Sequence, residues 1–201
     1  MVTKVLYLIV TLVILTTLYY GASYITPFKA AELPVTFIDR NISFHIAFAY
    51  VYISFYLMLL ISILSNKKSY SLQCAITLVT NTLIASSIFF FFPTRMPVAI
   101  YSSTEHTNYF LCRFVQGLDV ETNCFPSLHI ANAYAAAFYL AIDKKLYVKC
   151  TIWAWYGLIC WSVISTGQHY FYDIIGGIIL AQISFYIIKK LSHYQNIVQA
   201  N

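Results

Sequence analysis

A histidine and an aspartate stand four residues apart near the C-terminus. His169 and Asp173 lie where one apolar stretch gives way to the next. In a helix this spacing places both side chains on one face, so the carboxylate can accept a hydrogen bond from one imidazole nitrogen. The other ring nitrogen then keeps a lone pair that can act as a nucleophile or a base. A pair of this kind can also simply tie two helices together, so the surrounding pattern has to decide.

A second histidine stands near the start of another apolar stretch. His129 ends the run C-F-P-S-L-H at residues 124–129. Proline in the first turn and serine near the N-cap are signals of a helix start, where unpaired backbone N–H groups bind anions. His129 and Ser127 beside such an anion site suggest phosphate chemistry. This favours a functional interpretation of the pair at 169 and 173.

The elements that position these residues are expected to be transmembrane helices. The chain has 201 residues, of which 60% are hydrophobic and 9% charged, whereas soluble domains have about 25% charged residues. A helix needs about 20 mostly apolar residues to cross a bilayer. The sequence therefore predicts one all-α integral membrane domain over residues 1–201, a six-transmembrane-helix bundle with spans at about 4–24, 44–65, 71–92, 127–142, 150–167 and 171–188.

The distribution of basic residues predicts the orientation of these spans. Short loops rich in Lys and Arg remain in the cytoplasm. Eight of the twelve basic residues fall on one side, namely Lys4, Lys67, Lys68, Lys144, Lys145, Lys149, Lys189 and Lys190. Both termini are therefore predicted to be cytoplasmic, and the two histidines and Asp173 to face the other side. The alternative that the first stretch is a signal peptide is weaker, because its apolar run exceeds the usual length of about 7–15 residues.

Other classes of partner find little support. The net charge of +5 comes from small clusters between apolar stretches, whereas nucleic-acid binding needs a basic stripe. The five cysteines lack the paired spacing of a zinc site, so no metal and no cofactor are predicted. Cys112 and Cys124 share the loop 93–126, where a disulfide could form in an oxidising compartment.

Two of these stretches resemble signatures of the type 2 phosphatidic acid phosphatase (PAP2) superfamily. Its signatures read K-x6-R-P, P-S-G-H and S-R-x5-H-x3-D, carried on six helices. Residues 126–129 are similar to the second, and the spacing of Ser162, His169 and Asp173 matches the third. Leu128 replaces the glycine and Val163 the arginine, while the first signature is reduced to F-P-T-R-M-P at 92–97. These forms look more like the inositol phosphorylceramide synthase branch.

The resemblance implies roles for the candidate residues. His169 would attack phosphorus to give a phosphohistidine, Asp173 would hold its tautomer, and His129 would protonate the leaving oxygen. Arg95 is the best remaining cation for the phosphate oxygens, with Ser127 as a further donor and Arg113 as a second candidate cation.

The function implied is that of a metal-independent lipid phosphatase or phosphotransferase. Its substrate would be a phosphorylated lipid at the non-cytoplasmic leaflet of a bacterial inner membrane or a eukaryotic secretory membrane. One alternative is a transferase that moves a phospho-headgroup to a second lipid alcohol. Another is a non-enzymatic membrane carrier or scaffold, whose intramembrane His and Asp would form a proton relay or substrate site.

Overall fold

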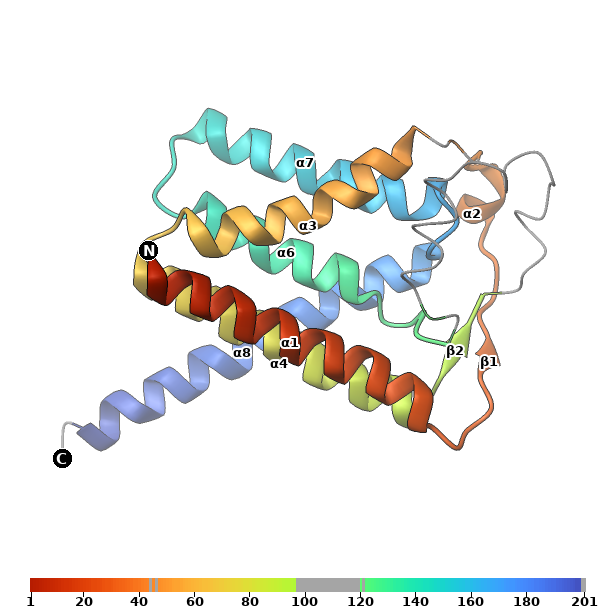
Figure 1. Cartoon of the computed structure of the whole chain (residues 1–201). Helices are drawn as coiled ribbons and strands as arrows, with labels where there is room; N and C mark the ends of the chain where they lie inside the picture. The colour runs from red at the N-terminus through yellow and green to blue at the C-terminus, as the bar shows by residue number, and fades with distance from the viewer. Residues whose placement is uncertain (44, 46, 97–119, 121, 200–201) are drawn as a thin grey trace.

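The computed structural model of the protein describes residues 1–43, 45, 47–96, 120 and 122–199. Within these residues the chain forms seven helices and two short strands (Figure 1). They are α1 (Val2–Ile25), β1 (Ala31–Glu32), α2 (Phe37–Asn41), α3 (Phe48–Leu64), α4 (Lys68–Phe91), β2 (Thr94–Arg95), α6 (Leu128–Ala141), α7 (Leu146–Ser165) and α8 (Phe171–Gln199).

A helix forms at each of the six predicted positions. Four of them, α1, α4, α7 and α8 over Phe171–Leu191, are long and apolar enough to cross a membrane. The other two are shorter, with 17 residues in α3 and 14 in α6. Helix α8 continues to Gln199, beyond the predicted end at 188. Polar residues end an apolar span without ending a helix, and residues 189–199 contain no glycine or proline that would stop the helix.

Helix α6 lies at the centre and packs against α3, α4, α7 and α8. Twelve of its fourteen residues are buried, and six of those twelve are alanines. Small side chains let neighbouring helix backbones approach closely, which is the usual way that helices associate in a membrane. A polar contact adds to this packing, because Asn81 of α4 donates to the Asn132 side chain and the Ala131 carbonyl, both at 3.1 Å.

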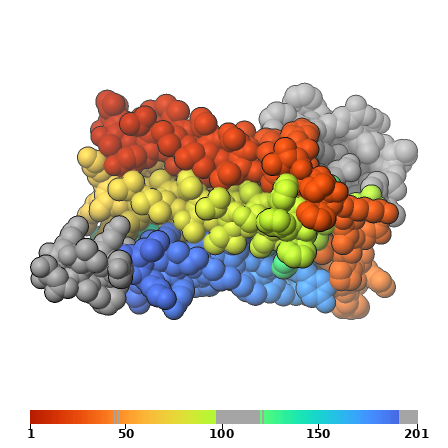
Figure 2. Space-filling view, turned by 90° about the horizontal axis from the view of Figure 1, so that it is seen from below, coloured from red at the N-terminus to blue at the C-terminus, as the bar shows by residue number. Residues whose placement is uncertain are grey.

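The two ends of the bundle differ. Helix α2, the strands and the N-terminal ends of α6 and α8 gather at one end, whereas α1 begins and α8 ends at the other (Figure 1). At that other end the Lys67 ammonium lies 2.9 Å from the Asp143 carboxylate. It lowers the pKa of Asp143, mainly through this hydrogen bond and to a smaller extent through charge attraction. Helices α1, α4 and α8 run side by side along one face (Figure 2).

A glycine allows the start of α6 to approach α8 closely. A Cβ atom built at Gly177 of α8 would lie 2.6 Å from the Ser127 carbonyl oxygen and 2.8 Å from the Ile130 Cβ. Because the first of these atoms belongs to the backbone, it cannot swing away as a flexible side chain could. Gly177 therefore allows the second signature, at the start of α6, to lie close to α8, the helix that contains Asp173.

Replacing Gly177 by alanine is expected to destabilise the protein by about 1–3 kcal/mol, the usual cost of overpacking a tightly packed core. The measurement is the free energy of unfolding in mixed detergent, followed by circular dichroism. Gly157→Ala in α7 is the matched control, because no atom lies within 4 Å of a Cβ built there. Equal stability of the two variants would contradict the close approach.

Candidate active site

The turn between α7 and α8 places His169. The Val163 carbonyl accepts from the backbone N–H groups of Gln168 at 2.9 Å and His169 at 3.1 Å. Gly167 takes a positive φ of 68° in this turn, a conformation in which glycine has no steric cost. The turn therefore reverses the chain within a few residues and presents His169 just before α8 begins.

His169 and Asp173 are in contact, as the sequence predicts, although the geometry differs from that of a continuous helix. The His169 Nδ1 lies 3.3 Å from the Asp173 Oδ2, and both side chains are buried. His169 precedes the helix, and only Asp173 lies in its first turn. The Tyr170 N–H also donates to the Asp173 Oδ2 at 2.8 Å. The carboxylate thus accepts an N–H at the start of α8 and holds the imidazole through Nδ1, so Nε2 is the ring nitrogen on the side away from the carboxylate.

The start of α6 joins this turn through the backbone. Ser127 is the N-cap of α6, and its Oγ accepts from the Ile130 N–H at 3.3 Å. The Ser127 N–H donates to the Asp173 carbonyl at 3.1 Å, so the second and third signatures are joined directly. As a result the ring centroids of His129 and His169 lie 5.8 Å apart. That separation allows one phosphoryl group to contact both rings.

Helix α3 contributes a residue that the sequence did not single out. The Tyr52 hydroxyl lies 2.9 Å from the His129 Nε2, and both Tyr52 and Phe55 place their rings 5.0 Å from the imidazole. Tyr52 is fully buried. Among the 18 tyrosines of the chain, nothing in the sequence distinguishes the one that reaches a catalytic candidate. Tyr52 therefore orients His129 through a contact that only the packing of α3 on α6 creates.

A largely apolar cavity of about 500 Å³ opens beside His129. Its walls come from α1, α3 and α6, and they include Leu12, Leu15 and Leu59 together with the polar side chains of His129 and Asn132. Cavities of this kind, with apolar walls and few polar groups, are typical of small-molecule sites. The imidazole of His129 is therefore accessible from a space suited to hydrocarbon.

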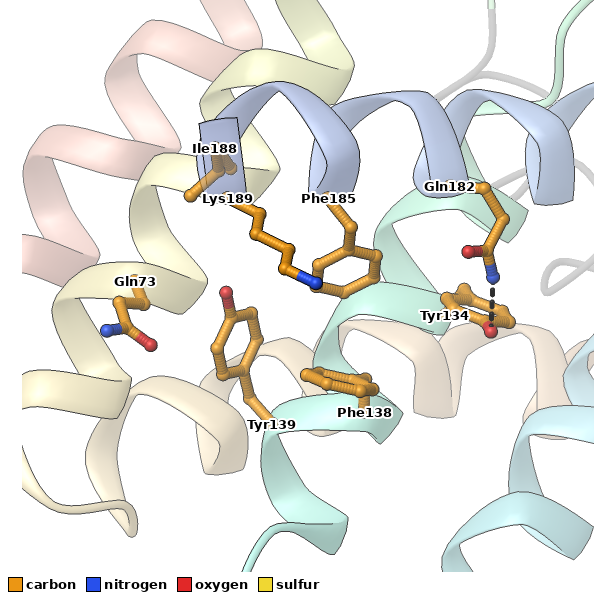
Figure 3. A pocket seen from close by; sticks show the side chains of 8 residues that line it. All are labelled: Gln73, Tyr134, Phe138, Tyr139, Gln182, Phe185, Ile188 and Lys189. Atoms are coloured by element: carbon orange, nitrogen blue, oxygen red, sulfur yellow. Dashed lines mark hydrogen bonds between the residues drawn. The ribbon is translucent and has the colours of Figure 1, made fainter. Parts of the chain in front are cut away.

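A second cavity, of about 370 Å³, lies between α4, α6 and α8 near the other end of the bundle (Figure 3). Figure 3 shows Lys189 and Tyr139 among the residues that line it, and the Gln182 side chain donating to the Tyr134 hydroxyl, at 2.5 Å. None of the candidate catalytic residues lines this space. The cavity beside His129, by contrast, borders a candidate catalytic residue.

Of the two predicted phosphate-binding cations, the structure describes Arg95. Arg95 on β2 pairs with Glu32 on β1, with 2.7 Å between Arg95 Nη2 and Glu32 Oε1, and both side chains are about half exposed. Arg113 lies outside the described residues, as does Cys112, the predicted partner of the buried Cys124. The strand still affects the site, because the Thr94 Oγ1 accepts from the Phe125 N–H at 2.8 Å. The remnant of the first signature thus holds Phe125, the residue just before the second signature, in place.

One departure from the family signatures has a structural explanation. Val163, at the position of the third-signature arginine, is fully buried in the hydrophobic core. A cation at this position would lose its hydration, which costs several kcal/mol unless it is paired.

Among the residues that the structure describes, no group of three His, Cys, Asp or Glu side chains could hold a metal ion.

An aspartate from the first interhelical segment also reaches the site. Asp39 of α2 is buried, and its Oδ1 accepts from the Phe171 N–H at 2.8 Å. In the sequence Asp39 is one of two acids between the first two apolar stretches, the other being Glu32. The capping pattern at Thr36 and Asp39 could have indicated a short helix there. Its contact with α8 could not have been inferred.

The two joined signatures lie at one end of a bundle of apolar helices. The profile of the PAP2 superfamily matches residues 26–187, and the chain belongs to this superfamily. The resemblance inferred from the signatures is thereby confirmed. Membership supports an enzyme that acts as a phosphatase or phosphotransferase.

Individual relatives match less extensively. The chain is 37% identical over 70 residues to the inositol phosphorylceramide synthase catalytic subunit aur1 of Schizosaccharomyces pombe, which covers 33% of this chain and 16% of that protein. Among solved structures, the crystal structure of LpxE from Aquifex aeolicus is similar, with a TM-score of 0.47 and 21% identity. That similarity covers 85% of this chain and 94% of LpxE.

Replacing Ser127 by alanine removes the N-cap of α6 and is expected to lower the free energy of unfolding by about 1 kcal/mol. Chemical unfolding followed by circular dichroism measures the change. Ser87→Ala is the control, because the exposed Ser87 hydroxyl donates only to the Leu83 carbonyl within α4. If both variants lost the same stability, the capping role of Ser127 would be wrong.

Proposed function

We propose that the protein is a lipid phosphatase or phosphotransferase that works through a phosphohistidine formed on His169. The observation that carries this proposal is the joint geometry of the two signatures. Asp173 holds the His169 Nδ1 at 3.3 Å, and His129 lies across the site with its ring centroid 5.8 Å away. A nucleophile, its orienting carboxylate and a second histidine as acid are the groups that such a reaction needs.

In the first step the His169 Nε2 attacks phosphorus as the bond from phosphorus to the lipid oxygen breaks. His129, in its protonated form, gives a proton to the leaving oxygen, so the lipid departs as an alcohol or a phosphate. Asp173 accepts the Nδ1 hydrogen bond and stabilises the positive charge that develops on the His169 ring. In the second step an oxygen of water or of a second alcohol attacks phosphorus, returns a proton to His129 and frees His169.

The phosphate oxygens need positive partners during both steps. The Ser127 hydroxyl can donate to them while its oxygen accepts the capping hydrogen bond. Arg95 would exchange Glu32 for phosphate, and because both side chains are about half exposed this exchange costs little. Arg113, in the same loop, is the further candidate cation. These groups would serve in place of a metal ion.

A phosphorylated lipid suits the cavity beside His129. Apolar side chains of α1 and α3 line most of it, while the polar side chains of His129 and Asn132 mark its inner wall on α6. A hydrocarbon tail in this space would bring the attached phosphate next to the imidazole. The Leu12, Leu15 and Leu59 side chains would then contact the tail.

We infer that the six helices α1, α3, α4, α6, α7 and α8 all span the membrane, with both termini cytoplasmic. The Lys-rich connections support this orientation, as Lys67 and Lys68 precede α4 and Lys144 and Lys145 precede α7. The catalytic residues, at the other end of the bundle, would then act on the non-cytoplasmic leaflet.

Replacing His169 by alanine is expected to lower turnover by about 10³-fold or more, because the nucleophile is lost. The measurement is phosphate release from phosphatidate, polyprenyl pyrophosphate, lipid A and phosphoinositol lipids by the purified protein. His193→Ala, at the other end of α8, is the matched control and should keep wild-type turnover. If His169→Ala keeps most of the activity while circular dichroism shows it folded, the proposed function is wrong.

Replacing His129 by alanine is expected to slow turnover by an amount that depends on the leaving group. With a lipid alcohol as leaving group the loss should be about 10²–10⁴-fold, the usual contribution of a general acid. With a nitrophenyl phosphate ester the loss should be much smaller, because nitrophenolate leaves without a proton. Steady-state kinetics on both substrates measure the difference, and equal losses would exclude His129 as the acid.

Transfer of a phospho-headgroup is the second candidate function. The observation that favours it is the identity with part of an inositol phosphorylceramide synthase subunit, together with Val163 and Leu128 at the variant signature positions. The two functions differ in what attacks the phosphohistidine. Turnover that depends strictly on an added lipid alcohol would support transfer, whereas phosphate release from one lipid alone would support hydrolysis.

A further inference from the structure

Asp39 is a buried carboxylate that the proposed reaction does not use. It lies in α2, between α1 and α3, and only 1% of its surface is exposed. Burying an ionised carboxylate is costly unless hydrogen bonds satisfy it. Its placement therefore depends on the groups that donate to its two oxygens.

The two oxygens of Asp39 have different partners. The Oδ2 accepts from the Thr36 N–H at 2.7 Å and from the Thr36 hydroxyl at 2.6 Å, within its own short helix. The Oδ1 accepts from the Phe171 N–H at 2.8 Å, which belongs to the first residue of α8. One carboxylate thus joins the segment after α1 to the helix that carries Asp173.

Two carboxylates divide the N–H groups at the start of α8 between them. Asp173 takes the Tyr170 N–H at 2.8 Å, and Asp39 takes the Phe171 N–H. Such N–H groups have no partner within the helix and need an outside acceptor when they are buried. The other oxygen of Asp173, Oδ1, has no hydrogen-bond partner among the described residues.

We propose that Asp39 is a positioning residue that clamps the start of α8 and so keeps Asp173 aligned with His169. This inference rests on the proposed function for its kinetic readout. By holding the Phe171 N–H, Asp39 leaves the Asp173 Oδ2 committed to the His169 Nδ1. It also adds negative charge at the positive end of α8, which stabilises that helix end. The first interhelical segment thereby becomes part of the catalytic framework without contacting the substrate.

The test compares Asp39→Ala, Asp39→Asn and a control. Asp39→Ala is expected to lower kcat by about 10- to 100-fold, the cost of displacing a catalytic group by a fraction of an ångström to 1 Å. KM should change little, because Asp39 does not contact the lipid. Asp39→Asn keeps an oxygen for the Phe171 N–H but has only one, so its kcat should lie between those of alanine and wild type. Asp143→Asn, an exposed aspartate at the other end of the bundle, should match wild type.

A second readout does not depend on turnover. The ¹⁵N NMR signals of the imidazole report which nitrogen carries the proton, and the His169 signals are identified by their absence from His169→Ala. In wild type the proton is expected on Nδ1, and in Asp39→Ala the signals should show a mixture of tautomers. If wild type turned over no phosphorylated lipid, with or without an added lipid alcohol, the proposed function would fail, and this NMR comparison alone would decide the role of Asp39.

Two results would overturn the role of Asp39. The first is a folded Asp39→Ala protein with wild-type kcat and an unchanged His169 tautomer. The second is a loss of activity that only follows the fraction of folded protein, with the remaining folded molecules fully active. Rescue of kcat by asparagine, together with a changed tautomer in Asp39→Ala, would support the clamp.

Discussion

The structure depends on keeping a carboxylate satisfied inside an apolar helical bundle. Asp173 is completely buried, and an unpaired charge at such depth is expensive. The Tyr170 N–H and the His169 Nδ1 both approach its Oδ2, while the Ser127 N–H takes its backbone carbonyl. His169, Tyr170 and Asp173 lie together at the end of the third signature, and Ser127 belongs to the second, so the contacts around Asp173 join the two signatures at one point.

Close packing around α6 makes this assembly possible. The alanines of α6 and Gly177 of α8 remove the side-chain bulk that would hold the helices apart. His129 therefore lies next to the turn that contains His169, and the Tyr52 hydroxyl of α3 contacts the His129 ring. The same packing buries Val163, which explains how a signature position that often carries arginine can be apolar in this chain.

The sequence by itself determined the helices and which residues are candidates for the reaction. Long apolar stretches predict helices because a backbone in lipid must satisfy its own hydrogen bonds, and a helix forms at each of the six predicted positions. The contact between His169 and Asp173 followed from their spacing, and Ser127 as a helix cap followed from local chemistry. The family also followed, since its signatures are short and local.

Tertiary structure alone decided which distant residues support those groups. The local pattern at Asp39 indicates only a short helix, and Tyr52 is one of 18 tyrosines; both reach the site only because α2 and α3 pack beside α8 and α6. The ion pair of Arg95 with Glu32 likewise depends on the parallel pairing of two strands far apart in the sequence. Contacts between remote segments carry no short-range signal, because they arise from the summed packing of the whole bundle.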